Sequence, residues 1–262
     1  MSSERSDVEV ARQVADAAGA ALLELRASDD DPATLRTRGD RTAHTTIVDL
    51  LAQLRPDDAV LSEEAADDPR RLESSRVWIV DPLDGTREYG EAGRHDWAVH
   101  VALWQDGDLA AAAVAIPARG VTLTTDLPRG AAGSEVPADA GAAGDGTPRR
   151  PRLAVSRSRA TPTVTELAEA LDAELVPLGS AGYKTSAVVL GDVDAYVHTG
   201  GQYEWDSAAP VAVARAAGLH TSRVDGTALQ YNRPDPLLPD LVVCRPDLAD
   251  AILDHLNPSR TK

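Results

Sequence analysis

The chain has 262 residues, 43% of them apolar and 26% charged, which suits one large folded unit or two joined halves and excludes a disordered or fibrous chain. Its net charge of −16 excludes a protein that coats a nucleic-acid polymer, but it permits a small phosphorylated substrate held by metal cations or a local basic pocket. The single cysteine excludes a disulfide framework. No stretch approaches the ~18 apolar residues of a membrane span, and the N-terminus is polar. We therefore expect a cytoplasmic protein without a membrane partner.

The first half of the chain predicts two helices followed by a sheet. Apolar residues at helical spacing predict an amphipathic helix over 8–26, and a second helix is expected to follow Asp40 and to end at Pro56. Short apolar runs then predict strands that are buried on both faces, at 77–80, 98–104, 109–116 and 121–124.

Residues 126–151 are rich in Ala, Gly, Pro and Asp without any period, which predicts a loop or linker. Beyond it, predicted strands at 153–156, 175–178, 195–198 and 241–244 alternate with predicted helices at 162–172, at 183–190, from near Asp206 and at 247–256. This order of elements predicts an α/β protein of two joined halves, 1–125 and 152–262.

Three acidic clusters lie at the edges of predicted elements. Ser-Glu-Glu occupies 62–64 after a short apolar run, Asp-Pro-Leu-Asp-Gly-Thr occupies 81–86 after a predicted strand, and Glu-Trp-Asp occupies 204–206 at the start of a helix. A buried strand that ends in Asp places this carboxylate at the carboxyl edge of the sheet, where α/β proteins bind ligands. Carboxylates that converge without a cysteine or histidine cluster are oxygen ligands that select Mg²⁺ over Zn²⁺. Two such ions would activate a water molecule and stabilise the leaving oxygen of a phosphate ester.

Each cluster alone also has an ordinary structural interpretation. Asp206 is a candidate N-cap for the following helix, and the acidic residues within 63–68 are a candidate charged surface run. The pattern at 81–86 is one residue too long for the Asp-x-Asp-x-Thr nucleophile loop of haloacid dehalogenases, and the sequence has no phosphate-loop or dinucleotide fingerprint. The combination of three clusters is what favours a functional site.

Isolated residues carry less information than the clusters. The six histidines, His100 and His198 among them, lack metal-site spacing and favour structural or solvated roles. Lys184, the only lysine before the C-terminal residue, has two open interpretations: a contact to a non-scissile phosphate or a base, or a surface lysine at the start of a helix. Cys244 lies in an apolar run and is predicted to fill the core.

The order of the three clusters resembles the inositol monophosphatase superfamily of Mg²⁺-dependent, lithium-sensitive phosphatases, over roughly residues 8–256. Within it, residues 76–89, 96–103 and 200–206 are similar to the CysQ group of 3′(2′),5′-bisphosphate nucleotidases, particularly the actinobacterial form. The resemblance implies a layered α/β/α/β/α sandwich, which agrees with the predicted order of elements.

The resemblance also implies the roles of individual residues. Two or three Mg²⁺ ions would be bound by four carboxylates and one backbone carbonyl, namely Glu63, Asp81, Asp84, Asp206 and Leu83. Thr86, paired with Asp40, would orient and deprotonate the attacking water. Backbone N–H groups of Gly85 and Thr86 would bind the scissile phosphate. The other substrate contacts would be Ser156, Ser158, Arg159, Lys184 and Asp206.

The reaction implied by the resemblance is removal of the 3′-phosphate of 3′-phosphoadenosine 5′-phosphate to give AMP and phosphate, in sulfate assimilation, by a possible homodimer. An inositol 1-phosphate or fructose 1,6-bisphosphate phosphatase would share the metal motif and is an open alternative. A pocket expected around Arg157, Arg159, Tyr183 and Lys184 would separate these substrates. A catalytically silent regulator that binds a nucleotide or metal would lack one ligand or the threonine, and this chain has all of them.

Overall fold

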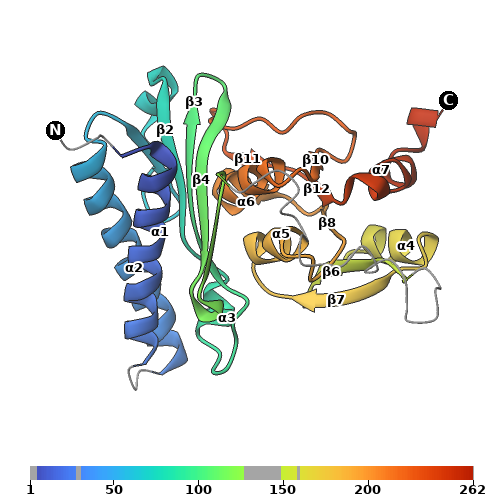
Figure 1. Cartoon of the computed structure of the whole chain (residues 1–262), viewed down its shortest axis with the longest axis horizontal. Coiled ribbons are helices and arrows are strands. Elements are labelled where there is room, and N and C mark those ends of the chain that lie inside the picture. Colours follow the sequence, from blue (N-terminus) through green and yellow to red (C-terminus); the bar gives the residue numbers. More distant parts are fainter. Residues whose placement is uncertain (1–4, 28–30, 127–148, 158–159, 262) are drawn as a thin grey trace.

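The computed structural model describes residues 5–27, 31–126, 149–157 and 160–261, and it stacks two five-stranded sheets between layers of helices (Figure 1). The outer layer on one side is α1 (Asp7–Arg26) with α2 (Pro32–Leu54), followed by the first sheet. The central layer is α5 (Ala181–Val189) with α6 (Glu204–Ala216), followed by the second sheet and then by α4 (Pro162–Ala170) with α7 (Ala249–Leu256). This order confirms the expected α/β/α/β/α sandwich.

The second helix begins earlier than the sequence analysis predicts. Asp31 caps α2, because its Oδ1 accepts hydrogen bonds from the backbone N–H groups of Ala33 (3.0 Å) and Thr34 (3.2 Å). Pro32 occupies the first helical position, where a backbone N–H would have no acceptor within the helix, so its absence costs no hydrogen bond. The prediction of a start after Asp40 is wrong because the first turns of α2 bury few apolar residues. Asp40 therefore lies inside the helix rather than before it.

The first sheet contains β1 (Ala59–Ser62), β2 (Arg76–Asp84), β3 (Ala98–Gln105), β4 (Asp108–Ile116) and β5 (Val121–Thr124) in that spatial order. β1 is parallel to β2, and the other neighbours are antiparallel. Trp78 and Val80 pack with α1 and α2, whereas Val77 and Ile79 pack with α5 and α6. The predicted burial of these strands on both faces is confirmed. The sequence analysis does not predict β1, whose apolar run is short.

The second sheet contains β6 (Arg152–Ser156), β7 (Glu174–Leu178), β8 (Ala195–His198), β10 (His220–Ser222) and β12 (Leu241–Cys244). Its spatial order is β10-β12-β8-β6-β7. The described residues also form a short helix, α3 (Thr86–Tyr89), a two-stranded pair, β9 (Gln202–Tyr203) with β11 (Leu237–Leu238), and four short 3₁₀ helices. The predicted strands and helices of this half are confirmed within a few residues, but β9, β10 and β11 are too short to show periodicity in the sequence.

Most of the predicted linker, residues 127–148, lies outside the described residues, so the division into halves at 126–151 stays a prediction. Cys244 is wholly buried among apolar side chains of the second sheet and its covering helices, as expected. Along the described ranges, every helix is too short or too polar to cross a membrane.

Candidate active site

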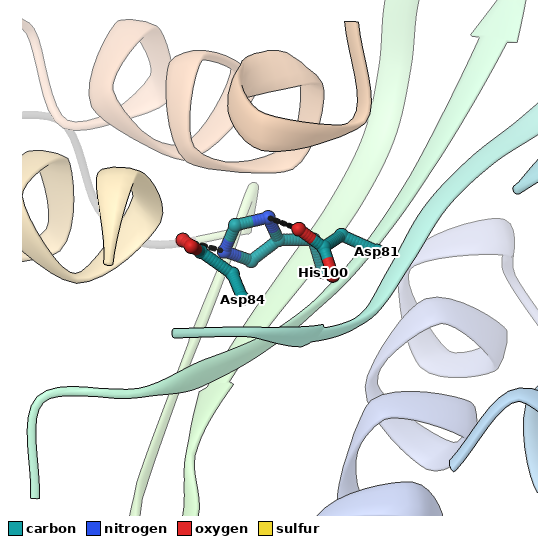
Figure 2. A group of neighbouring side chains, drawn as sticks. All are labelled: Asp81, Asp84 and His100. Atoms are coloured by element: carbon teal, nitrogen blue, oxygen red, sulfur yellow. Dashed lines mark ion pairs between the residues drawn. The ribbon is translucent and has the colours of Figure 1, made fainter. Parts of the chain in front are cut away.

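The end of β2 brings two carboxylates together. The pairing of β2 with β3 shifts between Asp81, which lies opposite His100, and Asp84, which lies opposite Ala98. The extra residue of this bulge interrupts the alternation of the strand, so both carboxylates lie around the same histidine ring (Figure 2). Both aspartates are buried.

Glu63 and Asp206 complete an acidic cluster with this pair. Glu63 follows β1, and its carboxyl group contacts that of Asp81 because the parallel strands β1 and β2 end side by side. Asp206 lies in the first turn of α6, where its Oδ2 accepts a hydrogen bond from the backbone N–H of Tyr203 (2.6 Å). The interpretation of Asp206 as the N-cap is wrong, since Tyr203 is the N-cap.

Three carboxyl groups of this cluster have raised pKa values. Burial and the charge of Glu63 raise the pKa of Asp81 well above its usual range. Desolvation and the charge of Asp84 raise the pKa of Glu63 to about 7, although the residue is exposed. Desolvation and the charge of Asp84 also raise the pKa of Asp206 to about 7. These shifts show that the carboxylates crowd together without enough positive charge around them.

This donor set fits a divalent metal ion. One ligand atom from each of Asp81, Asp84 and His100 lies within 4.8 Å of the others, so these three residues could hold an ion (Figure 2). The carboxylates of Glu63 and Asp206 add oxygen donors to the same cluster. A cation would neutralise the repulsion that raises their pKa values.

His100 joins the group although the sequence favours a structural role for it. Its ring is wholly buried, and Nε2 lies 3.4 Å from Asp84 Oδ2. Nδ1 lies 4.0 Å from Asp81 Oδ2 and 3.0 Å from the carbonyl oxygen of Trp205. Burial lowers the pKa of His100, against the opposing charge of Asp84. The signal that identifies this residue is its cross-strand register with Asp81, which spacing along the sequence does not show.

Thr86 and Asp40 are in hydrogen-bonding contact. Thr86 begins α3 directly after Gly85, whose φ of 86° favours glycine. Its Oγ1 lies 3.2 Å from Asp40 Oδ1 and 3.0 Å from the carbonyl oxygen of Leu83. Desolvation and the charge of Glu64 raise the pKa of Asp40 to about 6, against the hydrogen bond from Thr86. Asp40 is thus suited to accept a proton near neutral pH.

A glycine lets α2 bring Asp40 to this position. A Cβ atom on Gly39 would lie 2.7 Å from Tyr89 Cε1 and 2.9 Å from Leu83 Cδ2, both of them on buried side chains. The helix therefore touches the β2–α3 segment at Gly39, directly beside the Asp40 carboxylate.

The start of α5 lies against Asp84. Asp84 Oδ2 accepts hydrogen bonds from Ser180 Oγ and from the backbone N–H of Gly182, both at 2.5 Å, and Oδ1 accepts one from the N–H of Ala181 (3.2 Å). Ser180 has a φ of 50°, which is uncommon for a residue with a side chain. The sequence analysis missed these contacts, although the Gly-Ser-Ala-Gly run at 179–182 marks the start of a helix.

A pocket of about 390 Å³ adjoins the acidic cluster, because Ala181, which contacts Asp84, also lines the pocket. The polar and aromatic side chains that line it are Arg87, Ser156, Thr161, Lys184, Tyr196, His198 and Thr199. This volume is of the size that holds a small ligand.

Lys184 is only 6% exposed, so its interpretation as a surface lysine is wrong. Its Nζ donates hydrogen bonds to the carbonyl oxygens of Ser180 (2.6 Å) and Gly179 (3.3 Å) and lies 5.1 Å from the ring centre of Tyr196. Tyr183, expected to line the same pocket, is buried but is not part of its lining.

Two of the predicted substrate contacts, Ser158 and Arg159, lie outside the described residues. Arg157 does not line the pocket, because ion pairs with Glu88 (2.7 Å) and Glu91 (3.0 Å) hold its guanidinium. The expectation that Arg157 helps to form this pocket is therefore wrong.

Comparisons with known proteins agree with these features. The inositol monophosphatase family model matches residues 4–260. The 3′-phosphoadenosine 5′-phosphate phosphatase of Mycobacterium leprae is 49% identical over 263 residues, which cover 96% of this chain and 93% of the relative. The 3′(2′),5′-bisphosphate nucleotidase CysQ of Escherichia coli K12 is 32% identical over 208 residues, which cover 77% of this chain and 81% of the relative.

Solved structures agree on the fold. The crystal structure of CysQ from Bacteroides thetaiotaomicron has a TM-score of 0.71 at 26% identity, covering 91% of this chain and 97% of that one. Inositol monophosphatase II of Staphylococcus aureus has a TM-score of 0.77 at 21% identity, covering 96% of this chain and 95% of that one. The family match extends over nearly all of the sequence, and the chain belongs to the inositol monophosphatase family.

Proposed function

We propose that this protein is a Mg²⁺-dependent phosphomonoesterase that removes the 3′-phosphate of 3′-phosphoadenosine 5′-phosphate, giving AMP and phosphate. The observation that carries the choice of substrate is the 49% identity, over nearly the full length, to a relative named for this activity. Three proposed metal ligands, Asp81, Asp84 and Asp206, are present and close together, which argues against a silent regulator.

The proposed metal ligands are the carboxylates of Glu63, Asp81, Asp84 and Asp206, with the backbone carbonyl of Leu83. Enzymes of this family are metal-dependent, and oxygen donors alone in this set favour Mg²⁺. When bound, such ions supply positive charge that acidifies water and stabilises the leaving oxygen of a phosphate ester.

The protein's own contribution to proton transfer comes from Thr86 and Asp40. The Thr86 hydroxyl has one hydrogen, which can point to the Leu83 carbonyl oxygen (3.0 Å) or to Asp40 Oδ1 (3.2 Å). In the orientation toward Asp40, its lone pairs can accept a hydrogen from water. The Thr86 oxygen would take a proton from the water while the hydroxyl passes its own proton to Asp40. The hydroxide left behind would be the nucleophile for in-line attack on phosphorus. The half-buried position that raises the pKa of Asp40 makes it a better proton acceptor than an exposed aspartate.

The substrate would lie across the acidic cluster and the adjoining pocket. In this proposal, N–H groups of Gly85 and Thr86 bind the scissile phosphate, and the leaving 3′-oxygen departs on the side of Asp206. The rest of the nucleotide occupies the pocket of about 390 Å³, where Lys184 is the buried cation for the non-scissile phosphate. Ser156 also lines this pocket, and Ser158 and Arg159 remain proposed contacts from the adjoining segment.

The physiological part of the proposal follows from the family resemblance. The enzyme would act in the cytoplasm, as a homodimer, on a by-product of sulfate assimilation. Li⁺ would inhibit it by competing with a weakly held Mg²⁺.

The experiment that tests the substrate is phosphate release with Mg²⁺ from 3′-phosphoadenosine 5′-phosphate, inositol 1-phosphate and fructose 1,6-bisphosphate, compared as kcat/KM. A preference for the nucleotide of more than ~100-fold, which is about 2.7 kcal/mol in transition-state binding, supports the proposal. Equal or better rates on the sugar phosphates would replace it with a general phosphatase. No turnover of any of the three would favour a silent binding protein.

A further inference from the structure

His100 lies where three segments of the site meet. It is on β3, opposite Asp81 of β2, and no part of it is exposed. One ring nitrogen faces the carbonyl of Trp205 in α6, and the other faces Asp84 and the start of α5. Strand β3 belongs to the first sheet, whereas α5 and α6 come from the second half of the chain (Figure 1).

The Nδ1 atom donates a hydrogen bond across this junction. A backbone carbonyl can only accept, so the 3.0 Å contact with the Trp205 oxygen requires the hydrogen on Nδ1. Trp205 immediately precedes Asp206, the carboxylate that α6 contributes to the acidic cluster. This hydrogen bond therefore holds the first turn of α6 at a defined distance from the strand beside Asp81.

The Nε2 atom faces the backbone of Gly182. A Cβ atom placed on Gly182 would lie only 1.9 Å from Nε2 and 3.0 Å from Asp84 Oδ2, so the backbone of Gly182 fills the space in front of both atoms. Asp84 Oδ2 already accepts hydrogen bonds from Ser180 Oγ and Gly182 N. Nε2 is buried and, within the part of the chain that the structure describes, has no hydrogen-bond partner, and the Gly182 backbone packs against it.

We propose that His100 is a positioning residue, which fixes Trp205 and hence Asp206 relative to Asp81 and Asp84, and that the carboxylates bind the metal without it. The ring acts as a spacer. The hydrogen bond from Nδ1–H positions α6, and packing of the ring edge at Nε2 positions Gly182 at the start of α5. The catalytic effect expected of this role rests on the proposed function, but its effect on metal binding does not.

Three variants test the proposal through Mn²⁺ binding, measured by electron paramagnetic resonance, and through steady-state kinetics on 3′-phosphoadenosine 5′-phosphate with Mg²⁺. His100→Phe keeps an aromatic ring, one atom larger, but removes the donor, and His100→Asn keeps a nitrogen donor at the δ position. Leu103→Ala is the matched control, because Leu103 is equally buried in β3 and packs toward α1 and α2, away from the site. Thermal unfolding of all three variants reports how much stability each has lost.

We expect His100→Phe to weaken Mn²⁺ binding by about 10-fold or more and to lower kcat by about 30-fold, with KM changed less than about 3-fold. His100→Asn should recover most of both losses, and Leu103→Ala should lower the melting temperature while Mn²⁺ affinity stays within about 2-fold of the original. Electron spin-echo spectra of the Mn²⁺-loaded protein should lack the nitrogen coupling of a coordinated imidazole.

A coordinated-nitrogen signal would overturn the proposal by making His100 a ligand. Original Mn²⁺ affinity in His100→Phe, or losses in Leu103→Ala equal to those in His100→Phe, would also overturn it, since the ring would then have no role or only a stabilising one. If the unmodified protein releases no phosphate from the nucleotide, the proposed function fails, and the Mn²⁺ measurements still decide the role of His100.

Discussion

At the scale of single residues, the site contains carboxylates that we propose bind metal ions and a second group that we propose transfers a proton. Burial raises the pKa of Glu63, Asp81 and Asp206, and the charges of Glu63 and Asp206 raise that of Asp81 further. Asp40 stands at the edge of that cluster and touches Thr86 instead. Its raised pKa, about 6, places its change of charge close to neutral pH.

Replacing Asp40 should remove the proton acceptor and little else. We expect Asp40→Asn to lower kcat/KM by roughly 100-fold at pH 8, in the range usual for loss of a general base. The difference from the original protein should narrow as pH falls below about 6, because Asp40 is then protonated in the original protein too. Phosphate release measured from pH 5 to 8 checks this, with Asp49→Asn, an exposed position on α2, as the control. A ratio that does not change with pH would contradict the role of Asp40.

Lys184 should act on only one part of the substrate. It is the buried cation of the pocket, so Lys184→Met should lower kcat/KM for 3′-phosphoadenosine 5′-phosphate by about 100-fold. For 3′-AMP, which lacks the 5′-phosphate, the loss should be less than about 5-fold. Kinetics on both substrates, with the melting temperature as a check on folding, measure this difference. Equal losses on the two substrates would mean that Lys184 only supports the Gly179–Ser180 turn.

At the scale of elements, the sequence predicts helices and strands that have a local apolar pattern. It does not predict residue roles that depend on contacts between distant segments. Strand β2 can be predicted because it contains a continuous apolar run, and α1 can be predicted because its apolar residues repeat at helical spacing. The start of α2 is missed because Asp31 and Pro32 are the signal there, and no apolar repeat accompanies them. His100 and Gly182 are missed for another reason: their roles depend on strand register and on the docking of α5, which exist only in the folded chain.

The close approach of α2 to β2 can be tested through Gly39. A Cβ atom there would crowd Tyr89 and Leu83, so Gly39→Ala should push the helix outward and separate Asp40 from Thr86. We expect kcat to fall by about 10-fold or more, although alanine is intrinsically the better helix former. Gly19→Ala in α1 is the matched control, because its Cβ atom would crowd Pro117 at the same 2.7 Å, away from the site. Activity loss in both variants alike would show that crowding in general, and not the position of Asp40, limits the rate.

At the scale of the whole molecule, the site lies where the first sheet meets the central helices. Asp81 and Asp84 come from the first sheet, while Asp206 and the turn that binds Asp84 come from the central helices. Three acidic clusters in order along the chain predict the composition of such a site, but their convergence depends on the packing of α5 and α6 between the sheets (Figure 1). The repulsion within the cluster therefore acts on the stability of the whole fold.

The sign of that effect follows from the protons bound in each state. Glu63 and Asp206 have ordinary pKa values of 4.5 and 3.8, and both are raised to about 7 in the metal-free fold. From about pH 4 to 7 the unfolded chain has released these protons while the folded protein keeps them, so the free energy of unfolding falls as pH rises through this window.

We expect that fall to be on the order of 2 kcal/mol between pH 5 and 8, a figure discounted for solvent screening because Glu63 is exposed. Saturating Mg²⁺ should abolish the fall, because the ion replaces the protons and its stabilising effect grows as the carboxylates ionise. Urea unfolding across this pH range measures how the free energy of unfolding changes with pH, once with EDTA and once with Mg²⁺. Asp206→Asn should flatten the metal-free slope and weaken the response to Mg²⁺, whereas Asp57→Asn, at an exposed position, should change neither. Metal-free stability that rises with pH would mean that the four carboxylates are already neutralised by the protein, and the case for a metal ion at this site would fail with it.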